Sequence, residues 1–109
     1  MSDDDTPPET GSGPSVPPDA LSREMPIINK RGLHARASAK FVQMVERFNA
    51  EIWVTRGNET VGGTSIMGLM MLSAGPGTTI TVSAAGPEAE AALNAITELV
   101  GEKFHEENT

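Results

Sequence analysis

The chain has 109 residues, no cysteine and a formal net charge of -7. This length suits one domain with a single small core, and the lack of cysteine excludes disulfide bonds and thiol chemistry. The longest apolar stretches are far too short to span a bilayer, and the sequence opens without a basic-then-apolar leader. We therefore expect a cytoplasmic protein that does not insert into a membrane.

Most of the negative charge lies near the N-terminus. Residues 1–24 hold six acidic side chains and one basic one, a net charge of -5, which leaves -2 for the rest of the chain. Residues 1–20 are rich in Asp, Pro, Gly and Ser and offer almost no apolar side chains for burial. We expect a disordered acidic tail over residues 1–20, a domain over residues 21–106 and a flexible C-terminus over residues 107–109.

The sign of the charge reverses between residues 27 and 49. Five basic side chains oppose the single acid Glu46 in this stretch, and they are Lys30, Arg31, Arg36, Lys40 and Arg47. A basic patch suits acidic protein partners. Five basic residues without interleaved aromatic residues are a poor footprint for nucleic acid, so we expect no nucleic-acid partner.

The domain is predicted to begin with a strand, a loop and a helix. Residues 21–28 alternate as in a strand, where Pro26 fits only at an edge or an unpaired position. A loop over residues 29–33 precedes a helix that starts at Ala35. Its apolar face is formed by Ala37, Phe41, Met44, Val45 and Phe48.

A hairpin and a short apolar helix are predicted next. Residues 52–55 and 60–62 form two strands around a turn, and Ser65 caps a helix from residue 66 to about residue 72. The apolar run of this helix is too continuous for one buried face. We therefore expect some of its methionines to be exposed, while Leu69 and Leu72 pack in the core.

A strand over residues 78–83 and a last helix complete the pattern. Residues 86–88 open this helix, and its apolar stripe continues to Phe104. The element order is βαββαβα, which predicts an α+β fold. We expect an open-faced two-layer sandwich, with a four-stranded antiparallel sheet and three helices on one face.

The most informative residues lie where the first predicted helix begins. His34 stands at the start of the helix, and Arg36 follows two residues later. The first N–H groups of a helix have no intrahelical partner and attract anions. A neutral imidazole is a nitrogen nucleophile, and a guanidinium matches phosphate oxygens. Although His34 alone could merely cap a helix or lie in the core, the combination favours a histidine that takes up a phosphoryl group.

Two segments together resemble the HPr family, the histidine-containing phosphocarriers of the bacterial phosphoenolpyruvate phosphotransferase system. They are residues 29–37, which look like the active-site loop and helix start, and residues 64–72, which look like the regulatory-serine region. The resemblance implies that His34 accepts a phosphoryl group from phospho-enzyme I and donates it to an enzyme IIA-type acceptor. Arg36 would contact the phosphoryl oxygens, and the N–H groups of Ala35 and Arg36 would help to hold them.

The resemblance also implies regulation and docking. Ser65 matches the serine that HPr kinase/phosphorylase modifies. Partner docking is assigned to Ile66, Met67 and Met70, and to Arg31 and Lys40 from the basic stretch. The resemblance implies a carrier without turnover of its own and without a cofactor or metal, and we expect a monomer.

Two alternatives stay open from the sequence. The domain could be a regulatory binding module whose affinity for target proteins is switched by phosphorylation, without onward sugar transport. The phosphocarrier itself could serve sugar transport or the nitrogen-related regulatory branch, which the Gly-Leu-Met-Met-Leu run over residues 68–72 resembles. A small metabolite-binding domain of similar layers would require both segments to match by coincidence.

Overall fold

The computed structural model describes residues 14–106. The predicted disorder of residues 1–13 and the predicted flexibility of residues 107–109 lie outside the described residues. Residues 14–20 precede the first strand and contain a turn in which the Ala20 N–H donates to the Pro17 carbonyl over 3.1 Å. Within residues 14–106, no helix is long and apolar enough to cross a membrane.

Four strands form one antiparallel sheet. They are β1 (Leu21–Pro26), β2 (Glu51–Arg56), β3 (Glu59–Gly62) and β4 (Thr79–Ala85), in the spatial order β1-β4-β2-β3. Pro26 lies opposite Thr79 at the end of β1, which is an edge strand. This confirms the prediction that proline fits here only at an edge, where its missing N–H costs no ladder hydrogen bond.

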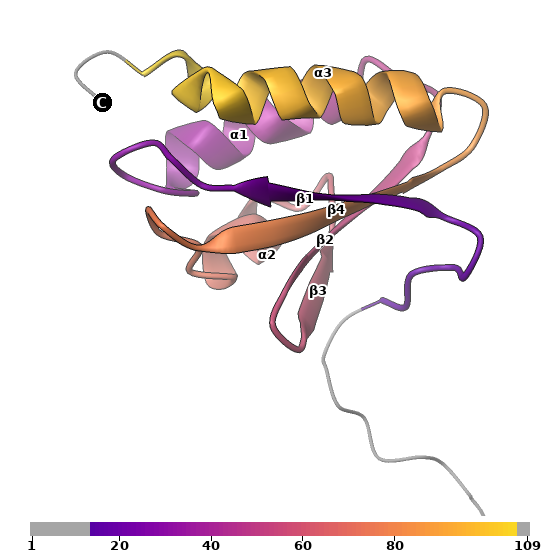
Figure 1. Cartoon of the computed structure of the whole chain (residues 1–109), viewed down its shortest axis with the longest axis horizontal. Coiled ribbons are helices and arrows are strands. Elements are labelled where there is room, and N and C mark those ends of the chain that lie inside the picture. The colour runs from indigo at the N-terminus through magenta and orange to yellow at the C-terminus, as the bar shows by residue number, and fades with distance from the viewer. Residues whose placement is uncertain (1–13, 107–109) are drawn as a thin grey trace, which may run out of the picture.

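Three α-helices pack with this sheet. They are α1 (Ala35–Val45), α2 (Ile66–Met71) and α3 (Ala89–Gly101). In Figure 1, α1 and α3 lie together over one face of the sheet, and α2 packs against α1 and β3. The predicted α+β fold is confirmed in its order βαββαβα, its four-stranded antiparallel sheet and its three helices.

Two predicted helices are shorter than their apolar stripes. Phe48 and Phe104 continue the helical spacing, but α1 ends at Val45 and α3 ends at Gly101. Phe104 is nevertheless fully buried, because it lies in a short 3-10 turn, η1 (Lys103–His105), with φ of 55°. The spacing therefore indicated correctly that Phe104 is buried and Phe48 partly buried, but it was wrong about helical continuity at both residues.

The core lies between the sheet and the two long helices. Val54, Ile80 and Val82 from the strands meet Phe41 and Ile96 from the helices, and none of the five is exposed. Each side chain of this size contributes about 1.5–3 kcal/mol when it leaves water. This packing fixes α1 on the sheet and thereby the end of α1 that carries His34. The predicted burial of Leu69 and Leu72 is confirmed.

Candidate functional site

His34 forms the N-cap of α1. Its backbone is extended (φ -75°, ψ -177°), and its Nδ1 accepts a hydrogen bond from the Arg36 N–H over 3.2 Å. The side chain is 22% exposed, so a reacting group can reach the ring. Because Nδ1 is an acceptor here, a neutral imidazole in this geometry carries its hydrogen on Nε2 and its free lone pair on Nδ1.

The loop before His34 is held by backbone packing. Gly32 has a φ of +67°, a left-handed conformation that glycine adopts without strain. The Leu33 N–H donates to the Ala74 carbonyl over 2.9 Å, which ties this loop to the segment after α2. The buried Asn29 closes the loop, because its Nδ2 donates to the Gly32 carbonyl over 2.8 Å. These hydrogen bonds therefore fix the backbone position of the loop that leads into His34.

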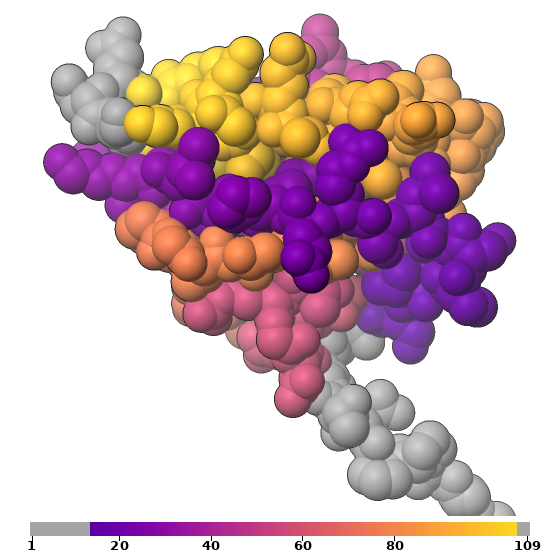
Figure 2. All heavy atoms as spheres, viewed as in Figure 1, coloured from indigo at the N-terminus to yellow at the C-terminus, as the bar shows by residue number. Residues whose placement is uncertain are grey.

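The carboxylate of Glu106 completes the site from the other end of the domain. Its Oε2 contacts the Nε2 of His34 and accepts a hydrogen bond from the Asn29 Nδ2 over 3.2 Å. Figure 2 shows the C-terminal segment in yellow lying directly against the loop that follows β1. The sequence analysis included Asn29 in the active-site segment without giving it a role. It did not identify Glu106, because no local pattern signals a contact between residues 72 positions apart.

The surroundings of Glu106 favour its charged form. Burial acts to raise the pKa of this carboxyl group, since its side chain is only 9% exposed. Hydrogen bonds from His34 and Asn29 act in the opposite direction, and electrostatic attraction to His34 and Arg31 adds to them. The balance holds the pKa of Glu106 below its ordinary value. An ionised acceptor therefore faces the Nε2 of His34.

The segment that carries Glu106 is anchored on α1 and α3. Phe104 is buried in the core, and its carbonyl accepts a hydrogen bond from the Lys40 Nζ over 2.7 Å. Lys40 was predicted to dock partners, and the structure gives it this bond within the chain.

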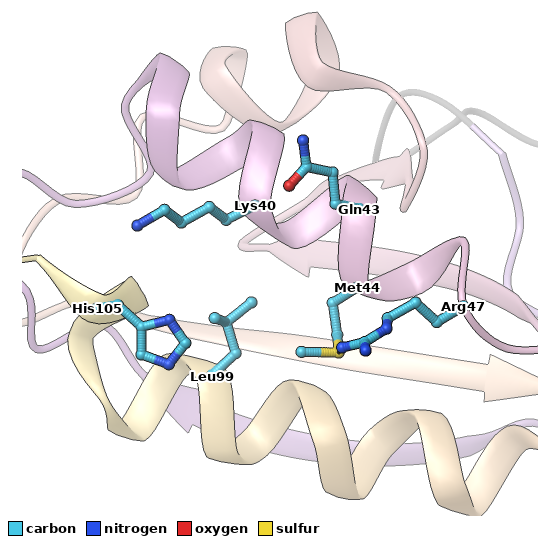
Figure 3. Close-up of a pocket in the computed structure, with 6 residues that line it drawn as sticks. All are labelled: Lys40, Gln43, Met44, Arg47, Leu99 and His105. Carbon is cyan, nitrogen blue, oxygen red and sulfur yellow. The ribbon is translucent and has the colours of Figure 1, made fainter.

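Beside Lys40 is an open groove of about 370 Å³ between α1 and α3, with an exposed His105 at one end (Figure 3). Its lining residues are Lys40, Gln43, Met44, Arg47, Leu99 and His105.

The remaining predicted site residues of this loop and helix are exposed around His34. Ala35 and Arg36 are the first residues of α1, at the positive end of the helix dipole. Arg31 lies on the preceding loop. The structure thus places a helix N–H group beside the ring of His34, with exposed basic residues in the adjoining loop and first helical turn.

Ser65 caps α2 as predicted. Its Oγ accepts a hydrogen bond from the Gly68 N–H over 2.9 Å, and the residue is exposed. An exposed apolar patch follows directly, in which the residues Ile66, Met67, Met70 and Met71 are 40%, 72%, 43% and 71% exposed. Met71 is thus as exposed as Met67, although the sequence analysis did not assign it to docking. The segment after α2 is hydrogen-bonded to the loop before His34, through the Leu33 N–H and the Ala74 carbonyl, so this patch is close to the end of α1 that carries His34.

Both His34 and Ser65 lie within the part of the chain that matches a known family. A family model described as "PTS HPr component phosphorylation site" matches residues 21–102. The chain is a member of the HPr family. Phosphocarrier protein HPr of Neisseria meningitidis serogroup A is 48% identical over 86 residues, which cover 79% of this chain and 97% of that relative. Phosphocarrier protein NPr of Shewanella violacea is 45% identical over 86 residues, which cover 79% of this chain and 94% of that relative.

The fold agrees with this membership. The crystal structure of HPr-C-His from Thermoanaerobacter tengcongensis matches with a TM-score of 0.76 and 41% identity, over 80% of this chain and 98% of that one. The family resemblance noted from the sequence is therefore confirmed. The protein is a phosphocarrier of the phosphotransferase system and not an enzyme with turnover of its own. Family membership implies partners of the enzyme I and enzyme IIA types.

Proposed function

We propose that His34 is the phosphoryl acceptor of this carrier. In this role it takes the group from phospho-enzyme I and passes it to an enzyme IIA-type protein. The observation that carries the proposal is the orientation of the ring. Nδ1 faces the N-terminus of α1 and lies 3.2 Å from the Arg36 nitrogen, while Nε2 contacts Glu106. Nδ1 is therefore the nitrogen that receives the phosphorus.

The transfer step needs no base. The lone pair of Nδ1 attacks phosphorus in line with the bond to the donor histidine of enzyme I. That bond breaks as the new bond to Nδ1 forms, and its electron pair stays with the donor ring. Because Nδ1 carries no hydrogen, His34 releases no proton. The Arg36 N–H, which donates to Nδ1 before transfer, then becomes a donor to a phosphoryl oxygen.

Arg36 and the exposed surface have separate roles in this proposal. The Arg36 guanidinium and the N–H groups of Ala35 and Arg36 stabilise the negative charge of the bound phosphoryl group. Docking of both partners is assigned to Arg31, Lys40, Ile66, Met67 and Met70. Support comes from the exposure of the apolar members and from the position of α2 beside α1. Flexible methionines suit a surface that must fit more than one partner.

Labelling from radioactive phosphoenolpyruvate and enzyme I tests the proposal. Wild-type protein is expected to become labelled, His34→Ala to accept no label, and His105→Ala to be labelled like the wild type. His105 is the matched control because it is the other histidine, exposed on the surface and paired with Glu102 over 2.6 Å. Undiminished labelling of His34→Ala contradicts the proposal.

A second function is favoured by the geometry of Ser65. We propose that an HPr kinase/phosphorylase modifies its Oγ, which is exposed at the N-cap of α2 beside the apolar patch. A phosphate there would place negative charge in the docking surface and weaken the binding of enzyme I. Incubation with the kinase and ATP, followed by mass spectrometry, is expected to find phosphate on Ser65. Modification that persists in Ser65→Ala, or none in the wild type, contradicts this role.

A further inference from the structure

The chain contains two Glu–His pairs with different surroundings. Glu102 and His105 lie three residues apart on the surface, with side chains that are 53% and 58% exposed. Glu106 and His34 lie 72 residues apart, and their side chains are 9% and 22% exposed. A local pair on the surface is held weakly and costs little to break. A distant, largely buried pair instead requires the fold to bring its members together.

We propose that Glu106 is a positioning residue that holds the His34 imidazole in the tautomer with hydrogen on Nε2. This inference rests on the proposed role of His34 and assigns a further residue to the same site. The contacts of both ring nitrogens agree with this tautomer. Nδ1 accepts from the Arg36 N–H, and Nε2 faces an acceptor-only carboxylate oxygen. Both contacts require the same tautomer, which leaves the lone pair of Nδ1 at the helix N-terminus.

The C-terminal turn is built to deliver this carboxylate. Lys103, Phe104 and His105 all have a positive φ, between 55° and 60°, although none of them is glycine. This left-handed backbone conformation is unfavourable for residues other than glycine and persists only where the surrounding structure holds it. Burial of Phe104 and the bond from the Lys40 Nζ to its carbonyl supply that hold. This turn connects α3 to Glu106, whose carboxylate contacts the ring.

Glu106 also acts when the phosphoryl group is transferred onward to the next acceptor. When Nδ1 bears phosphorus and Nε2 keeps its hydrogen, the ring is cationic, and the facing carboxylate stabilises that charge. On transfer to the next acceptor, the bond from phosphorus to Nδ1 breaks and its electron pair stays on Nδ1. The hydrogen remains on Nε2, so the ring returns to its starting tautomer without any proton movement. By keeping the hydrogen on Nε2, Glu106 lets the ring leave phosphorus as a neutral imidazole in onward transfer.

Three variants separate these effects. Glu106→Ala removes the acceptor, and Glu106→Gln keeps an oxygen that can accept from Nε2 and Asn29 but removes the charge. Glu102→Gln is the matched control, because it makes the same change in the surface pair. Thermal unfolding of each variant is the control that establishes whether the variant is folded.

The first readout is NMR of the His34 ring nitrogens in the unphosphorylated protein, with the pH raised until the ring signals no longer change. We expect hydrogen on Nε2 in the wild type, in Glu106→Gln and in Glu102→Gln, and a mixture of tautomers in Glu106→Ala. The second readout is the rate of transfer to an enzyme IIA-type acceptor. We expect about a tenfold loss in both Glu106 variants, the effect of roughly one lost charge-assisted interaction, and no loss in Glu102→Gln.

The outcomes distinguish this inference from the proposed function. A wild-type tautomer in Glu106→Ala together with unchanged transfer in both Glu106 variants overturns the role of Glu106. That result leaves the role of His34 intact if His34→Ala still accepts no label. Labelling of His34→Ala at the wild-type level instead overturns the proposed function, whatever tautomer the ring adopts.

Discussion

Gly32 packs directly against the backbone of Ala74. A Cβ atom on Gly32 would lie 2.3 Å from the Ala74 carbonyl oxygen, and the N–H of the next residue, Leu33, donates to that same oxygen over 2.9 Å. The loop before His34 and the segment after α2 therefore interlock through backbone atoms. The first segment that carries the family resemblance thus meets the residues just after the second one, which couples the position of His34 to that of the apolar patch on α2.

Gly32→Ala is expected to destabilise the protein for two reasons. Its φ of +67° disfavours any other residue by about 1–2 kcal/mol, and the new Cβ would collide with Ala74. Gly57→Ala is the matched control, because Gly57 has a φ of +62° but has nothing within 4 Å of the added atom. Urea unfolding should show a larger loss for Gly32→Ala than for Gly57→Ala. Equal losses would mean that the contact with Ala74 does not constrain the loop.

Ser65→Ala should cost about 1 kcal/mol of unfolding free energy, since it removes the side-chain acceptor for the Gly68 N–H. Ser65→Asp supplies another acceptor of the kind preferred at an N-cap and should retain most of the stability. Thermal unfolding of the three proteins measures both effects. If Ser65→Ala proves as stable as the wild type, the cap does not stabilise α2.

The stability contributed by Glu106 should depend on pH. Because its pKa is lower in the folded protein than the ordinary value of 4.5, its charge stabilises the fold at neutral pH. This stabilisation is complete above the ordinary value and is lost as the pH falls through the lower folded pKa. Groups that face the carboxylate are His34 and Asn29, and the positive charge of Arg31 also acts on it.

Denaturant unfolding of the wild type and Glu106→Gln over a range of pH tests this dependence. We expect the wild type to be more stable by about 1 kcal/mol at pH 7, the usual scale for a hydrogen bond. The difference should shrink as the solution becomes acidic. A difference that stays constant down to about pH 3, where carboxyl groups are largely protonated, would exclude the carboxylate charge as its source.

Arg36→Ala is expected to accept label from phosphoenolpyruvate and enzyme I, but about tenfold more slowly, because one charged donor to the phosphoryl oxygens is lost. Arg36→Lys keeps the charge without the planar fork and should fall between Arg36→Ala and the wild type. Rapid-quench kinetics in both directions provide the rates. Wild-type rates for Arg36→Ala would remove Arg36 from the mechanism.

Local patterns in the sequence were sufficient for much of this site. The N-cap position of His34, the cap at Ser65 and the exposure of Met67 and Met70 all follow from residues within one or two turns of each other. Pro26 on the edge strand is a further example, because its chemistry alone restricts where it fits.

The C-terminal part of the site could not be predicted in the same way. The spacing of Phe104 continues the stripe of α3, and nothing in the local sequence indicates a left-handed turn at three residues that are not glycine. The contact of Glu106 with His34 depends on that turn and on the packing of Phe104 in the core. The hydrogen bond of Lys40, which the sequence analysis assigned to partner docking, was missed for the same reason, since its acceptor is a backbone carbonyl 64 positions away.

The most direct test of the account is to locate the phosphorus in the phosphorylated protein. Phosphorus and nitrogen NMR of protein phosphorylated by enzyme I and phosphoenolpyruvate identify both the histidine and the ring nitrogen that carry it. We expect one phosphohistidine, at Nδ1 of His34, with hydrogen on Nε2. Phosphorus at Nε2 of His34, or on His105, would contradict the account.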